Sequence, residues 1–112
     1  MTSIFIKKNA NGEITDFTAD GHAEYGVEGE DIVCAAVSSI IQTAALGIIM
    51  KAGVQAKLTR DDKKGYFKLE LPNGVTAAQR HDCNVILDTM VLGLGDLAEN
   101  YSDFIELSSR GA

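Results

Sequence analysis

Residues 32–50 read IVCAAVSSIIQTAALGIIM, a long apolar stretch without a charged side chain. The stretch is close to the ~20 residues needed to span a bilayer, so its length alone fits a membrane helix. Four polar residues interrupt it, namely Ser38, Ser39, Gln42 and Thr43. A helix that is apolar nearly all round is buried somewhere. We therefore expect a buried helix of a soluble domain with no membrane contact, running to about Lys51 and stopped by Gly53.

The residues before this helix have the pattern of a β-hairpin. SIFIKK (residues 3–8) and ITDFTADG (residues 14–21) alternate like strands. Asn11-Gly12 lies between them and is a strong signal for a tight hairpin turn. The domain should therefore open with two antiparallel strands.

The residues after the helix repeat this plan. VQAKLTRDD (54–62) and GYFKLELP (65–72) predict a second hairpin, and YSDFIELSS (101–109) predicts a last strand. Thr76 should cap a second helix, with Arg80 on its surface. The apolar stripe of that helix recurs at helical spacing, at Cys83, Ile86, Leu87, Met90, Leu94 and Leu97.

The predicted order is strand, strand, helix, strand, strand, helix, strand. This order indicates an α+β two-layer sandwich in which both helices cover a mainly antiparallel sheet. A chain of 112 residues fits one domain, residues 1–112. With 46% hydrophobic and 23% charged residues, the composition is that of a folded protein rather than a disordered one.

Charge and cysteine content limit which binding partners and which cellular compartment fit the chain. A net charge of -6 opposes a phosphate backbone, so direct nucleic-acid binding is disfavoured and basic partners are favoured. The two cysteines do not form a disulfide framework, and the first residues lack the apolar segment of a secretory leader. We expect a cytoplasmic protein.

His22 and Cys34 are candidates for a reacting pair. If Asp31 caps the helix, Cys34 is its third residue, where unpaired N–H groups and the helix dipole favour a thiolate. Gly21 allows a sharp exit from its strand and close approach of another backbone. The following loop is long enough to bring the imidazole to the helix start, as a Cys-His pair requires. Cys34 as a small buried residue and His22 as an exposed loop residue remain alternatives.

Asp31 and Ser38 lie about one helical turn from Cys34, on the same face. Either side chain could orient a catalytic partner. Asp31 could instead serve only as a cap, and Ser38 could bond to a carbonyl of its own helix.

No cofactor or metal is expected. His81 and Cys83 are two residues apart on a helix and point to different sides, and no CxxC or HExxH pair is present. The sequence also lacks GxGxxG, Walker and GxSxG motifs.

The elements Gly21-His22-Ala23 and Asp31-Ile32-Val33-Cys34-Ala35-Ala36, followed by Ser38, resemble the Prp family of ribosomal-processing cysteine proteases. The resemblance extends over nearly the whole chain. It implies a homodimeric peptidase that removes a short N-terminal extension from large-subunit ribosomal protein twenty-seven. By the same resemblance, Cys34 would be the nucleophile, His22 its base, and Asp31 and Ser38 polar companions.

The loop between His22 and the helix should act as a mobile lid over the peptide, because its glycines favour movement. It comprises Ala23, Glu24, Tyr25, Gly26, Val27, Glu28, Gly29 and Glu30. Its acidic residues would attract a basic ribosomal protein. A non-enzymatic acidic dimer that binds a ribosomal protein or assembly factor is the alternative function, and a redox-sensing thiol is a third.

Overall fold

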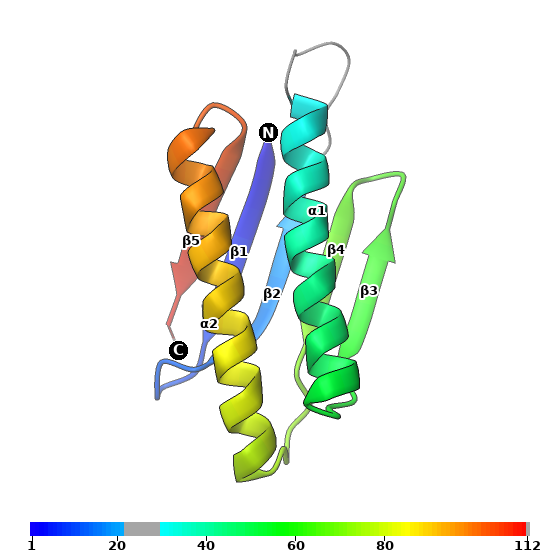
Figure 1. Ribbon diagram of the computed structural model, residues 1–112, viewed down its shortest axis with the longest axis vertical. Coiled ribbons are helices and arrows are strands. Elements are labelled where there is room, and N and C mark those ends of the chain that lie inside the picture. The colour runs from blue at the N-terminus through cyan, green and yellow to red at the C-terminus, as the bar shows by residue number, and fades with distance from the viewer. Residues whose placement is uncertain (22–29, 112) are drawn as a thin grey trace.

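The structure, a computed structural model, describes residues 1–21 and 30–111. Five strands form one sheet in the order β3-β4-β2-β1-β5, and the two long helices lie side by side over one face of it (Figure 1). The elements are β1 (Thr2–Lys8), β2 (Ile14–Asp20), α1 (Glu30–Leu46), η1 (Gly47–Lys51), β3 (Lys57–Asp61), β4 (Tyr66–Glu70), α2 (Ala77–Asn100) and β5 (Ile105–Arg110). The predicted α+β class and order of elements are confirmed.

The sheet is antiparallel except at one edge. The pairs β1–β2, β2–β4 and β3–β4 are antiparallel, whereas β5 lies parallel to β1. A parallel pair needs a crossover connection. β4 runs in the same direction as β1 and β5, and α2 makes the crossover from β4 to β5. α2 covers the sheet on the same side as α1 (Figure 1).

The first hairpin turns where the sequence predicts it. Gly12 has a φ of +78°, which favours glycine. The side chain of Asn9 accepts hydrogen bonds from the backbone N–H groups of Asn11 and Glu13, both at 3.0 Å. The turn is therefore held by a side chain that precedes it.

The core lies between the sheet and the inner faces of the helices. Ile4 and Ile6 alternate along β1, and both are 1% exposed. The predicted stripe of α2 is confirmed: Ile86 and Leu97 are partly buried, and four members are fully buried, namely Cys83, Leu87, Met90 and Leu94. Thr76 caps α2 as predicted, by accepting a hydrogen bond from the Gln79 N–H at 3.1 Å.

The first helix ends near Lys51, and Gly53 follows with a φ of +68°, as predicted. Its last turn, η1, is a wider π-helical turn that the sequence pattern does not indicate. Gly47 opens this turn at the contact with α2, where an added Cβ would lie 3.3 Å from Cδ1 of Ile86. A glycine here therefore permits close packing of the two helices.

The outer face of α1 differs from the expectation of a helix buried nearly all round. Ile32 and Met50 are 76% and 74% exposed. The segment Ile32–Lys51 is long and apolar enough to cross a membrane by length and composition, and 33% of its most apolar window is buried. Only the inner face is covered, because the described part of the chain places no element over the outer one.

A polar cluster joins the first hairpin to α2. Arg80, expected on the surface, is instead largely covered and donates a hydrogen bond to the Ile14 carbonyl at 2.9 Å. Glu13 accepts hydrogen bonds from Asn84 at 3.0 Å and from Asn9 at 3.1 Å. These bonds, with Arg80 nearby, lower the pKa of Glu13. Arg80 is drawn inward because the Ile14 carbonyl and the Glu13 carboxylate lie together.

Glu13→Gln should therefore weaken the dependence of stability on acid. The folded-state pKa of Glu13 lies below its unfolded value, so its contribution to stability is present above the unfolded pKa and is lost as pH falls through the folded pKa. The variant should be less stable than wild type at neutral pH. The difference in free energy of unfolding between the two should shrink on acidification below about pH 4. Urea unfolding at several pH values measures this. Glu99→Gln, an exposed substitution on α2, is the control; a gap that stays constant with pH would contradict the assignment.

Candidate active site

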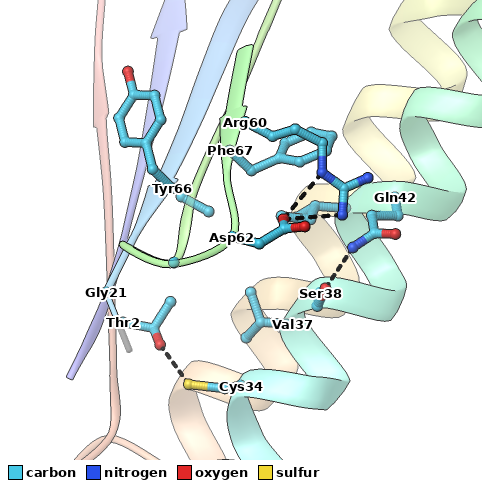
Figure 2. A pocket seen from close by; sticks show the side chains of 13 residues that line it. Thr2, Gly21, Cys34, Val37, Ser38, Gln42, Arg60, Asp62, Tyr66 and Phe67 are labelled. Atoms are coloured by element: carbon cyan, nitrogen blue, oxygen red, sulfur yellow. Dashed lines mark hydrogen bonds and ion pairs between the residues drawn. The ribbon is translucent and has the colours of Figure 1, made fainter. Parts of the chain in front are cut away.

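A cavity of ≈ 200 Å³ lies between α1, the start of β1 and the turn that joins β3 to β4 (Figure 2). Three predicted site residues line it, namely Gly21, Cys34 and Ser38. Cys34 is half-buried. The structure thus brings together residues from the end of β2 and from two successive turns of α1. Cys34 is a thiol at the wall of a cavity rather than a core residue.

The sulfur of Cys34 has a hydrogen-bonding partner that no sequence motif indicates. Thr2 Oγ1 lies 3.2 Å from Cys34 Sγ, and either atom can donate the hydrogen (Figure 2). Thr2 is 4% exposed. Its backbone N–H donates to the Phe104 carbonyl at 2.8 Å, which ties it to the loop before β5. One signal for Thr2 was present: it shares the inward face of β1 with Ile4 and Ile6.

The start of α1 corrects the prediction for Asp31. The helix begins at Glu30, so Asp31 lies inside its first turn and is not the N-cap, and Cys34 is the fifth helical residue rather than the third. Glu30, assigned to the lid, belongs to the helix. Glu30 is of a residue type that the helix dipole favours in a first turn, so cap type alone does not fix the start.

This shift places Cys34 about one turn inside α1. Unpaired N–H groups belong to the first four residues of a helix, so the amide of Cys34 is not one of them. Side chains on a helix tilt toward its N-terminus, however. The Cα–Cβ bond of Cys34 therefore tilts toward the first turn of α1, while its sulfur lies against Thr2 Oγ1.

Gly21 holds the end of β2 against the start of β1. Its φ is +135°, and an added Cβ would collide with the Met1 carbonyl oxygen and lie 2.9 Å from Thr2 Cα. Its N–H donates to the Gly65 carbonyl at 3.1 Å. The predicted close approach of another backbone is confirmed, and that backbone is β1.

His22 and residues 23–29 of the predicted lid lie outside the described residues. The pairing of His22 with Cys34 and the movement of the loop therefore stay predictions. Gly21, which directly precedes His22, lines the same cavity as Cys34.

Ser38 and Gln42 extend the polar wall along α1. Gln42 Nε2 donates a hydrogen bond to Ser38 Oγ at 2.6 Å (Figure 2). This is not the bond to a helix carbonyl that was considered as an alternative for Ser38. Because the Ser38 oxygen accepts from Gln42, its own O–H is available to a group bound in the cavity.

The opposite wall comes from the second hairpin, which no sequence motif assigns to the site. Arg60 donates to Asp62 through Nε at 3.2 Å and Nη2 at 3.1 Å (Figure 2). The guanidinium also lies 5.9 Å from the centre of the Phe67 ring. Phe67 is buried whereas Arg60 and Asp62 are exposed, so the charged groups lie at the rim of the cavity.

The second cysteine lies apart from this site. Cys83 is 0% exposed, and burial raises the pKa of its thiol. His81 lies on the exposed face of α2, with Nδ1 3.3 Å from Asp82. Between the two cysteines, only Cys34 is placed for chemistry with an external molecule.

Comparison with known proteins gives one consistent family. A model of the family described as Cysteine protease Prp matches residues 1–106. The ribosomal processing cysteine protease Prp of Staphylococcus aureus is 31% identical over 110 residues, 98% of this chain and 100% of that protein. Two crystal structures of Prp from S. aureus, one with a substrate peptide and one with a covalently linked product peptide, match with TM-scores of 0.86 and 0.83 at 29% and 30% identity. Both matches cover 98% of this chain and 100% of the other.

Gly21→Ala should disrupt the contact that closes the site. The new methyl group meets backbone atoms of Met1 and Thr2, which cannot rotate away as a side chain would. Gly12→Ala is a matched control, because Gly12 also has a positive φ but has nothing within 4 Å of an added Cβ. The control should lose roughly 1–2 kcal/mol and Gly21→Ala clearly more, as measured by denaturant unfolding. Equal losses of stability in the two variants would mean that the close approach at Gly21 adds no cost to the substitution.

Proposed function

Because the chain belongs to the cysteine protease Prp family, we propose that it removes the N-terminal extension of large-subunit ribosomal protein twenty-seven in the cytoplasm, in support of ribosome assembly. The observation that carries the proposal is the half-buried Cys34 thiol at a cavity that Gly21 also lines. The sequence match over residues 1–106 supports the same assignment. The S. aureus relative is itself named a ribosomal processing protease.

In the proposed reaction, Cys34 is the nucleophile. His22 takes the proton from the Cys34 thiol, and the thiolate attacks the carbonyl carbon of the scissile peptide. The imidazolium then returns the proton to the leaving amine, and a thioester remains on Cys34. Water, deprotonated by His22, hydrolyses the thioester and restores the free thiol.

The position of Gly21 supports His22 as the base. Consecutive Cα atoms are about 3.8 Å apart, so His22 is one residue of chain from a glycine that lines the cavity. Gly21, the residue before His22, thus lies at the cavity that Cys34 also lines. The N–H of Gly21 is bonded to the Gly65 carbonyl, which fixes the point from which His22 starts.

The developing oxyanion has donors available on α1. The unpaired N–H groups of the first helical turn carry the positive end of the helix dipole, toward which the Cys34 side chain tilts. The Ser38 hydroxyl, one turn further along, is a second source of a hydrogen bond. Such donors stabilise negative charge that forms during acyl transfer.

The charge of the chain suits a ribosomal substrate. The net charge of -6 attracts basic polypeptides, and Glu24, Glu28, Glu30 and Asp31 place acidic residues next to the site in sequence. Binding through this attraction weakens as salt is raised.

Cleavage of the extended ribosomal protein tests the proposal. After incubation with wild-type protein, mass spectrometry should show one defined cut, and Cys34→Ala, Cys34→Ser and His22→Ala should leave the substrate intact. Serine fails at position 34 because its hydroxyl is far harder to ionise than a thiol. Cys83→Ser is the matched control: it should retain the cut but unfold more easily, because it places a hydroxyl in the core.

An intact substrate in every tube would refute the proteolytic assignment and support the acidic binding module. Cleavage by wild type and by Cys34→Ala alike would assign the activity to another group. A Cys34 that reacts with alkylating agents equally well in wild type and in His22→Ala, without any cleavage, would indicate the redox-sensing thiol.

A second copy of this chain is the proposed partner of the uncovered helix face. Exposed apolar side chains lie on both helices, with Ile32 and Met50 on α1 and η1 and Leu92, 76% exposed, on α2. A groove of ≈ 600 Å³ runs between the helices, lined by residues such as Ile40 and Ile86. The homodimers of the family that this chain resembles are consistent with this face as the interface.

Placing a charge on this face should separate the copies. Met50→Glu and Leu92→Glu introduce carboxylates that would be buried without a partner in a dimer, which is costly. Light scattering should give twice the chain mass for wild type and the single chain mass for the variants. Ser108→Glu, exposed on the sheet away from the helices, is the control and should remain dimeric. Twice the chain mass in both helix variants would place the interface elsewhere.

A further inference from the structure

Among the side chains of residues 1–21 and 32–111, Thr2 is the one buried polar side chain. Its hydroxyl lies 3.2 Å from Sγ of Cys34 (Figure 2). No motif in the sequence analysis includes Thr2, and the proposed reaction does not use it. Its contact with the sulfur therefore needs its own explanation.

The backbone around Thr2 holds this hydroxyl in place. The Thr2 N–H is bonded to the Phe104 carbonyl at 2.8 Å, and Thr2 is paired with Ile105 across β1 and β5. On the other side, the backbone of Gly21 approaches so closely that an added Cβ would lie 2.9 Å from Thr2 Cα. Thr2 therefore presents its hydroxyl from a fixed strand rather than from a mobile end.

Packing alone does not call for a hydroxyl at this position. The inward neighbours of Thr2 on β1 are Ile4 and Ile6, and valine has nearly the shape of threonine. Burying a hydroxyl costs free energy unless it is well hydrogen-bonded, and a neutral thiol is only a weak acceptor. An ionised sulfur is a much better acceptor, since hydrogen bonds to charged groups are stronger than neutral ones.

We propose that Thr2 is a positioning residue for the proposed nucleophile: its hydroxyl donates a hydrogen bond to the Cys34 thiolate and holds the sulfur at the cavity wall. The inference rests on the proposed function, since it takes Cys34 as the nucleophile. In the neutral thiol either atom can donate. Once the sulfur has lost its proton, only the hydroxyl can, so the bond favours the ionised form.

This bond should change how the reactivity of Cys34 depends on pH. A hydrogen bond to a charged group shifts an ionisation equilibrium by about tenfold. Without it, fewer thiols are ionised at neutral pH, but each thiolate is somewhat more nucleophilic. The ratio of the alkylation rate at pH 7 to the rate at pH 10 separates these two effects, because the reactivity of the thiolate enters both rates and cancels in the ratio.

The test compares Thr2→Val, which keeps the shape, with Thr2→Ser, which keeps the hydroxyl. Iodoacetamide is the probe, and mass spectrometry assigns the modification to Cys34 rather than to the buried Cys83. The pH 7 to pH 10 rate ratio should fall about tenfold in Thr2→Val and stay close to wild type in Thr2→Ser. Thermal unfolding of each variant checks that the fold is retained.

Equal ratios in wild type and Thr2→Val overturn the inference, and so does an equal fall in both variants, which would mark a purely structural residue. The outcome is independent of the cleavage assay. If wild type cleaves its substrate while the rate ratios of wild type, Thr2→Val and Thr2→Ser agree, only the role of Thr2 is refuted. A wild type that does not cleave refutes the proposed function, whatever the ratios show.

Discussion

The packing of α1 onto the sheet is the interaction on which the site depends. Val33, Val37 and Ile41 follow one another at successive turns and are 2–3% exposed. Cys34 and Ser38 each come one residue after a member of this buried stripe, which places them at its edge. The same packing that builds the core therefore leaves the thiol half-buried at the cavity wall. A rigid helix seated in this way holds a side chain more precisely than a loop does.

Sequence patterns predicted what short-range rules decide. The Asn11-Gly12 turn, the Thr76 cap and the helical stripe around Cys83 each depend on a few neighbouring residues, and each was confirmed. The family motif identified Gly21 and Cys34 as members of one site before any distance was known. Periodicity alone did not predict whether Cys34 lies in the core or at a cavity, because a residue at the edge of an apolar stripe can occupy either place.

The features that were missed depend on contacts between distant parts of the chain. Thr2 meets Cys34 only because β1 lies beneath the start of α1, and Arg60 reaches the cavity from a separate hairpin. The start of α1 was misplaced because Asp31 is a good cap by type, and an acidic residue one position earlier is favoured in a first turn as well. Arg80 was placed on the surface because no sequence rule anticipates its bond to the Ile14 carbonyl.

The close contact of Gly21 with the start of β1 links fold and chemistry at one point. It presses the end of β2 onto Met1 and Thr2, so the strand that carries the hydroxyl and the glycine that precedes His22 meet beside Cys34. A side chain at position 21 would push the end of β2 away from Met1 and Thr2 at the start of β1. The glycine of the motif is thus required by backbone packing. Thr2 of β1, Gly21 after β2 and Cys34 of α1 line one cavity only when that packing is intact.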